Sequence, residues 1–354
     1  MNKERIEWMD AFRGIGMCCV IMGHMQIPKV LAQAIFSFHM PLFFFASGYL
    51  YSGRHGTAYV LKKVDSLIIP YLVYGVLGLA VRELGVGDVN WWFVKMLLCG
   101  NGVGVVWFLS CLFMADLIGS LVVTHIKQVP LVACAAIAMA GVGYWMENNG
   151  HFPILMSRVV FQACVFWIVG YLFRTGMVFD KLWLVMEPRK TRNTRKFLCI
   201  QCIPWLKLLV FAILVAGCAL FRLQRVDFGS MKTGNPVLLY ATAMAFIILI
   251  AFMSRRFLGK VRILKFMGRN SLLFMNWHVI IPTLSLYAIG LLGVDANSSF
   301  ALKCIQRVAN IALLFGCVWW LSRHANVLSG RGRFFSRFVM KSRKDSPSKL
   351  LTGK

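Results

Sequence analysis

Acidic residues are scarce in this chain of 354 residues, and charged residues of both signs together make up only 15% of it. The 13 Asp and Glu face 39 Lys and Arg, which gives a formal net charge of +26. Hydrophobic residues make up 59% of the chain and the mean hydropathy is +0.69, above the apolar share of roughly one half in soluble domains. This composition argues against a soluble basic protein that binds nucleic acid. It predicts a protein that crosses a membrane several times.

Signatures of several other protein classes are missing. The eleven cysteines are scattered, and the one C-x-x-C pair, Cys199 and Cys202, has no second pair or His cluster beside it, so no metal or redox site is predicted. The first apolar run follows an acid-containing segment and lacks an obvious small-residue cleavage site, so we interpret it as a span and not as a secretory signal. There is no internal repeat and no inverted pattern of broken helices of the kind found in many transporters.

Long apolar runs recur along the whole chain. Ten of them have about the length that a helix needs to cross a bilayer, roughly 20 residues, which predicts an all-α, polytopic integral membrane protein. The predicted spans cover residues 11–27, 34–53, 66–82, 104–124, 129–146, 155–173, 207–222, 236–253, 270–292 and 300–322. The stretch Trp91–Cys99 is apolar but too short to cross, and we expect it to be re-entrant or interfacial.

Lys and Arg are concentrated in alternate connections between the predicted spans. If the N-terminus is cytoplasmic, most of the 39 basic residues fall on the cytoplasmic side, and the positive-inside rule then predicts that both termini are cytoplasmic. We therefore expect a membrane domain over 1–322 with a basic cytoplasmic loop at about 174–206, followed by a basic cytoplasmic tail over 323–354. The loop and the tail would fix the topology and contact anionic lipid head groups.

Ionisable residues in the first predicted span indicate a functional site, because such residues are costly in a membrane helix. Asp10, Arg13 and His24 lie in a run otherwise suited to lipid. Arg13 and His24 are eleven residues apart, so on a helix they lie within about 20° of each other and about 16 Å apart along the axis. Asp10 precedes Arg13 by three and can pair with it. Gly14 and Gly16 would let another helix or a ligand come close.

Later motifs supply further candidate residues. A second His lies near the start of the second span, two lysines precede the third, a Trp opens the fourth, and an Asn-Ser pair and a His belong to the ninth. These candidates are His39, Lys62, Lys63, Trp107, Asn270, Ser271 and His278. Each candidate also has a structural explanation: an anchoring ion pair for the first span, hydrogen-bonding histidines, positive-inside lysines, aromatic-belt packing for the Trp and helix capping by the Asn.

Taken in order, these motifs resemble acyltransferase family 3 of integral membrane proteins. The chain has D-x-x-R-G, R-x(10)-H, F-H-M-P-L-F-F-F-x-S-G-Y, W-F-L and G-x-x-S-L…H, and its opening is similar to the branch described as fucose 4-O-acetylase and related acetyltransferases. The middle of the chain, 125–260, is similar only in hydropathy. Family members usually have R-x-x-R in the region of Lys63, whereas this chain has Ser66 where the second Arg would stand.

The resemblance implies an enzyme of the bacterial cytoplasmic (inner) membrane. It would move an acetyl group from cytoplasmic acetyl-CoA, as a co-substrate, to a sugar hydroxyl of a surface polysaccharide or its lipid-linked precursor. No tightly bound cofactor and no metal are expected. The partners would be acetyl-CoA, the carbohydrate acceptor and membrane lipids, and the oligomeric state stays open, a homo-oligomer included. The alternative is a carrier or flippase of a lipid-linked or anionic sugar, without acyl transfer.

The resemblance also implies roles for the candidate residues. His24 would be the general base, with an acyl-His intermediate as a variant, and His39 would assist it or bind the sugar. Asp10 would orient Arg13, and the cations Arg13, Lys62 and Lys63 would bind the phosphates of CoA. Alternatively, Arg13 would act in catalysis by polarising a carbonyl. The residues expected to contact substrate are Trp107, Asn270, Ser271 and His278.

Overall fold

The computed structural model describes residues 6–25, 27–53, 55–83, 90–149, 154–180, 204–292 and 300–336. Within these ranges the chain is α-helical apart from its connections, short 3-10 and π-helical turns and one isolated β-bridge. Most of the predicted basic loop (181–203, which includes Cys199 and Cys202) and the end of the predicted tail (337–354) lie outside the described residues. The chain divides into two compact units, each built from segments that are far apart in the sequence.

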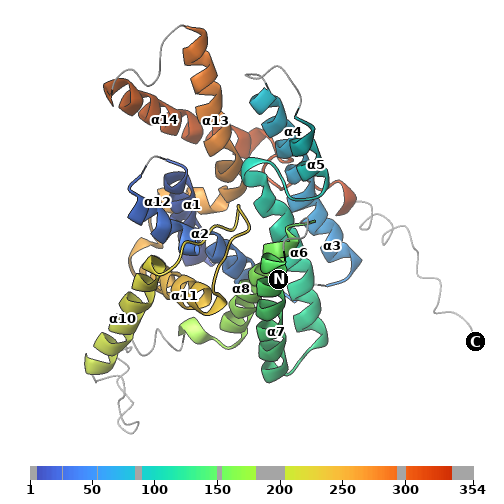
Figure 1. The fold of residues 1–354 in the computed structure, drawn as a ribbon, viewed down its shortest axis with the longest axis vertical. Coiled ribbons are helices and arrows are strands. Elements are labelled where there is room, and N and C mark those ends of the chain that lie inside the picture. The colour runs from blue at the N-terminus through green and yellow to red at the C-terminus, as the bar shows by residue number, and fades with distance from the viewer. Residues whose placement is uncertain are drawn as a thin grey trace, which may run out of the picture. The chain divides into compact units, whose positions relative to one another are not determined.

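The first unit comprises residues 1–52, 125–152 and 157–271. Its helices are α1 (Glu7–Gly23), α2 (Lys29–Leu50), α7 (Val129–Asn148), α8 (Ser157–Thr175), α10 (Pro204–Ala219), α11 (Pro236–Met253) and α12 (Arg262–Arg269). The central helix of this unit is α2, which packs against α1, α8 and α11. In addition, α7 packs against α8, α10 against α11, and α12 against α1 (Figure 1).

Glycines explain how closely α2 and α8 approach each other. A Cβ built at Gly48 would lie 1.8 Å from the carbonyl oxygen of Trp167, and one built at Gly170 would lie 2.1 Å from that of Phe45. Any side chain at these two positions would clash with backbone, so the two helices are in backbone contact, as in membrane helix pairs with small residues at the interface. Both helices also contribute fully buried aromatic side chains: Phe44, Phe45, Phe166 and Trp167.

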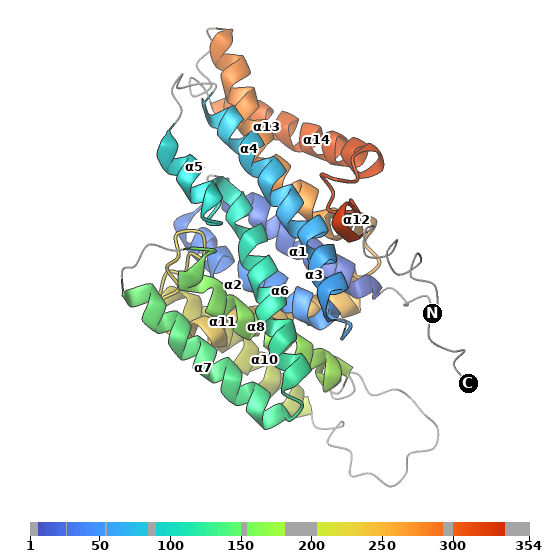
Figure 2. The same ribbon diagram turned by 90° about the vertical axis from the view of Figure 1, so that its right-hand side faces the viewer.

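The second unit comprises residues 53–124, 153–156 and 272–354. Its helices are α3 (Thr57–Lys63), α4 (Ile69–Glu83), α5 (Trp91–Leu98) and α14 (Phe300–His324), with most of α6 (Trp107–His125) and α13 (Ser271–Leu291). The π-helical turn η1 (Val64–Ile68) joins α3 to α4. The short α5 packs against α4 (Figure 2), and its eight residues are too few to cross a bilayer, as its sequence indicates.

Eight helical segments among the described residues are long and apolar enough to cross a membrane. They are Lys29–Leu50, Thr57–Glu83, Gly104–His125, Val129–Asn148, Ser157–Thr175, Pro236–Leu258, Ser271–Leu291 and Ala301–His324. The prediction of an all-α, polytopic membrane protein is confirmed. The remaining two of the ten predicted spans are also helices but shorter: α1 has 17 residues, among them Asp10 and Arg13, and α10 has 16.

The boundary between α1 and α2 differs from the predicted one. Both histidines therefore have other positions relative to the helix ends than the sequence predicts. The first helix ends at Gly23, so His24 is its C-cap and not an interior residue. The second helix begins at Lys29, directly after Pro28, because proline is tolerated at a helix start. His39 therefore lies ten residues inside α2, and its predicted position near the start of the span is wrong.

The third span begins earlier than predicted, at Thr57 and not at residue 66. Gly56, with φ of +80°, makes the turn that precedes the helix, because this backbone conformation favours glycine. Lys62 and Lys63 consequently lie inside the helical run and not in front of it. The π-helical turn η1 follows them directly. Such turns are rare in proteins, and many of those known lie at functional sites.

Candidate active site

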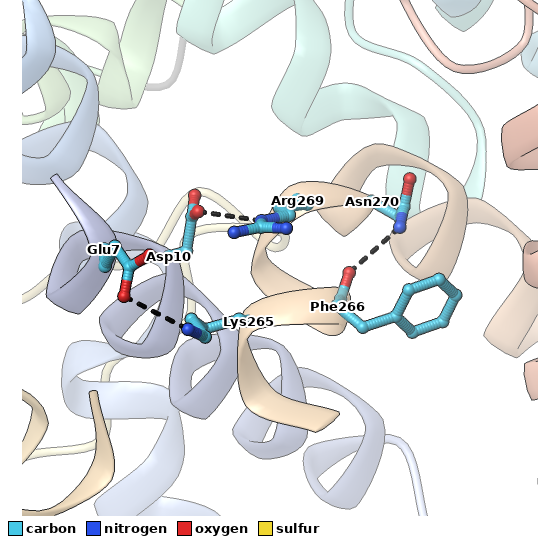
Figure 3. Close-up of polar contacts among 6 residues, drawn as sticks. All are labelled: Glu7, Asp10, Lys265, Phe266, Arg269 and Asn270. Atoms are coloured by element: carbon cyan, nitrogen blue, oxygen red, sulfur yellow. Dashed lines mark hydrogen bonds and ion pairs between the residues drawn. The ribbon is translucent and has the colours of Figure 1, made fainter. Parts of the chain in front are cut away.

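Two acids at the start of α1 face two bases of α12 (Figure 3). Lys265 Nζ lies 3.1 Å from Glu7 Oε2, and Arg269 Nε donates to Asp10 Oδ2 at 3.0 Å. The acids are three residues apart on α1 and the bases four apart on α12, so each pair shares one helix face. The Asp10 side chain is only 8% exposed, whereas that of Glu7 is 63% exposed. Arg269, which the sequence analysis did not single out, therefore compensates a mostly buried charge.

Two glycines allow α12 to come this close to α1. A Cβ built at Gly14 would lie 2.1 Å from the carbonyl oxygen of Leu264, and one built at Gly268 would lie 1.8 Å from that of Asp10. The expectation that Gly14 lets another helix approach is confirmed. The G-x-x-S motif thus packs directly on the D-x-x-R-G motif, although the two are far apart in the sequence.

The junction of α12 and α13 completes this polar end of α1. Arg13 Nη2 donates to Ser271 Oγ at 2.6 Å across a sequence separation of 258 residues. Asn270 Nδ2 donates to the carbonyl oxygen of Phe266 at 3.0 Å and so caps the last turn of α12 (Figure 3). Asp10 and Arg13 therefore each contact a residue of the segment 269–271, and their pairing with each other stays a prediction. Arg13, expected to bind CoA phosphate, and Ser271, expected to contact substrate, are direct neighbours.

The two candidate histidines lie at the opposite end of α1. The ring centroids of His24 and Phe36 are 6.4 Å apart, and those of Phe36 and His39 are 5.0 Å apart, both in edge-on geometry. The His24 side chain is exposed, while His39 is only 4% exposed. His39 Nδ1 lies 2.8 Å from the carbonyl oxygen of Ile35 and must donate to it, so the neutral ring carries its acceptor lone pair on Nε2. The pair thus combines one accessible and one buried imidazole.

A carboxylate that the sequence analysis missed lies near these histidines. Asp227 belongs to the connection between α10 and α11 and lies close enough to both His24 and His39 for its charge to act on both rings. Its Oδ1 accepts the backbone N–H groups of Gly229 and Ser230, and its Oδ2 accepts the Ser230 hydroxyl at 2.8 Å. Asp227 is the only acid in the sequence from residue 188 to residue 294, which is the signal that could have identified it.

The connection that carries Asp227 is fastened to the helices around it. At its end, Glu147 Oε1 of α7 accepts the backbone N–H groups of Thr233 at 2.7 Å and Gly234 at 3.1 Å, and Glu147 Oε2 accepts the Thr233 hydroxyl. At its start, Gln33 Nε2 of α2 donates to the carbonyl oxygen of Gln224 at 3.2 Å. These contacts hold Asp227 in place, since the segment is anchored on both sides of it.

Phe228, the residue after Asp227, anchors the middle of the same connection. Its ring lies 6.0 Å from that of Phe44 on α2 and 6.5 Å from that of Phe166 on α8, measured between centroids. It is almost fully buried. Among the described residues, no group of three or more His, Cys, Asp or Glu is arranged to hold a metal ion.

In the second unit, Lys63 forms an ion pair that the sequence analysis did not predict. Its Nζ lies 2.5 Å from Asp116 Oδ2, and Asp116 is only 1% exposed. Asp116 is the one acid of α6. An acid in an apolar span is costly, so its presence in the sequence could have identified Asp116 as a residue with a partner. Lys63 therefore compensates a buried charge, while Lys62 is exposed to its surroundings.

The remaining candidates of the second unit are Trp107 and His278. Trp107 begins α6 as the sequence predicts, and its side chain is half-buried. His278 lies inside α13, is 6% exposed, and its Nδ1 donates to the carbonyl oxygen of Phe274 at 3.0 Å. Trp277, beside it, donates its indole N–H to Tyr74 Oη at 3.1 Å and so links α13 to α4. Roles of Trp107 and His278 in substrate binding stay predictions.

The two ion pairs between α1 and α12 are expected to differ in strength. Removing one partner of a buried pair typically costs about 3–5 kcal/mol, whereas exposed pairs contribute about 1 kcal/mol or less. Double-mutant cycles would measure both coupling energies by thermal unfolding in detergent: Asp10→Asn with Arg269→Gln, and Glu7→Gln with Lys265→Gln as the matched control. We expect a larger coupling for Asp10 and Arg269. Equal coupling energies would contradict the importance given to the buried pair.

Comparison with known proteins identifies the family. The family model described as "Acyltransferase domain" (Acyl_transf_3) matches residues 6–323, nearly the whole chain. No curated protein and no solved structure matches the chain significantly. The match includes the polar end of α1, both histidines and the segment 269–271, which confirms at the level of the family the resemblance seen in the motifs. The chain therefore belongs to acyltransferase family 3 and is a membrane-bound acyltransferase.

Proposed function

We propose that this acyltransferase moves an acetyl group from acetyl-CoA to a sugar hydroxyl of a bacterial surface polysaccharide or its lipid-linked precursor, in the inner membrane. The observation that best supports the proposal is the arrangement at the end of α1, where the accessible His24 lies beside a second imidazole and within range of Asp227. The similarity of the opening motifs to the fucose 4-O-acetylase branch supports a sugar as acceptor. Family membership favours this enzyme over the carrier alternative, which involves no acyl transfer.

His24 is the proposed general base. A sugar hydroxyl is a weak nucleophile, and an imidazole titrates near neutral pH and can accept its proton as the oxygen attacks. In the proposed reaction the hydroxyl oxygen bonds to the thioester carbonyl carbon, and the proton passes to His24. The carbon–sulfur bond then breaks, the sulfur takes the proton from the imidazolium, and free CoA and the O-acetyl sugar are released. His24 returns to its neutral form, so the atoms and charges balance.

Asp227 is the proposed positioning residue for His24, and His39 is a proposed binding residue for the acceptor sugar. The imidazolium formed during the reaction carries a positive charge, and the fixed negative charge of Asp227 stabilises it most effectively in surroundings of low dielectric constant. The anchored connection keeps that carboxylate in place. His39, with its Nδ1 committed to Ile35, presents only Nε2 to the site and would accept a hydrogen bond from the acceptor sugar.

The donor is proposed to enter from the side that the positive-inside rule assigns to the cytoplasm. Arg13 lies at that end of α1, about 16 Å along the axis from His24, and the hydrogen bond to Ser271 holds its guanidinium. A guanidinium is always charged and binds phosphate groups through a fork of donors. Of the two lysines, Lys63 compensates Asp116, while Lys62 is exposed and is proposed to bind phosphate. The two ends of α1 thus carry a side chain suited to bind a donor phosphate, Arg13, and one suited to accept the proton of the sugar hydroxyl, His24.

Loss of His24 is expected to abolish acyl transfer without loss of folded protein. His24→Ala should lower the rate by a factor of about 10²–10⁴, the usual contribution of general base catalysis. The measurement is release of free CoA from acetyl-CoA by the purified protein, together with O-acetyl content of the glycan in cells. His55→Ala is the matched control, since His55 is exposed and its Nδ1 donates to the Gly53 carbonyl oxygen two residues before it. Full activity in His24→Ala would refute the proposed base.

The charge of Asp227 can be separated from its part in the local turn. Asp227→Asn keeps an oxygen for the backbone N–H groups of Gly229 and Ser230 and loses the negative charge, so we expect kcat to fall by a factor of about ten or more with little change in KM. Ser230→Ala removes one hydrogen bond of the turn and keeps the charge, and it should stay close to wild type. The reverse order of effects would show that Asp227 acts only in the turn.

A further inference from the structure

The segment that follows α14, residues 325–336, folds back onto the helical run formed by α3, η1 and α4. Tyr74 Oη donates to the carbonyl oxygen of Leu328 at 3.2 Å. Gly330 has φ of +68°, and a Cβ built there would lie 2.8 Å from the carbonyl oxygen of Ser66. Both observations require glycine at this position. We call residues 325–336 the post-α14 segment. Its backbone is in direct contact with the backbone of η1, within the second unit.

A buried carboxylate holds the end of this segment. Asp65, in η1, is only 2% exposed. Its Oδ1 accepts the backbone N–H of Phe335 and its Oδ2 accepts that of Ser336, each at 2.9 Å. A buried carboxylate is costly unless it is hydrogen-bonded, and loss of the segment would take away both of these donors. The post-α14 segment is therefore an integral part of the second unit and not a loose extension.

Two exposed cations, Arg333 and Lys62, have backbone positions near the Asp65 carboxylate. Arg333 is exposed and precedes Phe335 by two residues, so its Cα lies within about 7 Å of that of Phe335. Lys62 is exposed and precedes Asp65 by three residues on the helix, with about 5–6 Å between their Cβ atoms. Both long side chains thus start close to the Asp65 carboxylate. The neighbouring Lys63 is bound by Asp116.

We propose that the post-α14 segment forms a phosphate-binding site within the second unit, in which Arg333, together with Lys62, binds the phosphate groups of acyl-CoA. The proposal rests on the proposed function, because it assumes a CoA thioester as donor. Arg333 supplies a planar fork of donors that fits a phosphate, and Lys62 supplies a second, compact positive charge. The Asp65 contacts fix the backbone that carries Arg333, so little ordering is needed when the donor binds.

Binding of CoA to the purified full-length protein, measured by calorimetry, tests this site. Arg333→Ala and Lys62→Ala should each weaken binding roughly tenfold, as expected for loss of one charge-assisted contact. Lys260→Ala is the matched control, because Lys260 is an exposed cation of the first unit on the side predicted to be cytoplasmic. In steady-state assays the two site variants should raise KM for acetyl-CoA with little change in kcat. KM for S-acetylpantetheine, which has no phosphates, should not change.

The outcomes separate this proposal from the proposed function. If the wild-type protein binds CoA and Arg333→Ala binds it as tightly, the donor site of the post-α14 segment is wrong while the proposed function stands. If Lys260→Ala weakens binding as much as Arg333→Ala does, the effect is one of general charge, and the proposal is again wrong. If the wild-type protein neither binds CoA nor releases it from acetyl-CoA, both fail. Asp65→Asn, which should loosen the segment, is expected to weaken CoA binding as well.

Discussion

The cost of burying charge in an apolar helix bundle is the constraint on which the rest of the structure depends. Three acids of the described residues are buried in helices, and each has a partner from a distant segment. Arg269 binds Asp10, Lys63 binds Asp116, and backbone N–H groups at the end of the described chain bind Asp65. These partners lie between 53 and 271 residues away, so the contacts that compensate the buried charges also join distant segments within each unit.

The two ends of α1 are built for different tasks. At its start, glycines bring α12 into backbone contact and the segment 269–271 holds both Asp10 and Arg13. At its end, His24 leaves the helix and is exposed, beside a buried imidazole and an anchored carboxylate. Side chains that are held at a helix end and beside an anchored connection need little further ordering when a substrate binds. A helix of 17 residues thus links a polar anchor to the pair of candidate histidines.

The sequence was sufficient to predict the fold class and most of the spans, because apolar length alone decides which segments can cross a bilayer. It also identified the candidate residues of α1. It did not identify partners that come from elsewhere in the chain: the contact made through Gly14 and Gly268 gives Asp10 the partner Arg269. Asp116 and Asp227 stand out as lone acids in the sequence. Only the folded chain shows that one meets Lys63 and the other lies near the histidines.

The sidedness of the reaction is the most direct test of acetyl transfer from a cytoplasmic donor. Membrane vesicles that contain the protein and its native glycan would be prepared inside-out and right-side-out, and each would receive acetyl-CoA labelled in the acetyl group. The proposed function predicts labelled glycan from sealed inside-out vesicles, in which the cytoplasmic face is accessible, and none from sealed right-side-out vesicles until a detergent opens them. Labelling that is equal in both sealed preparations, or absent from inside-out vesicles, would contradict it.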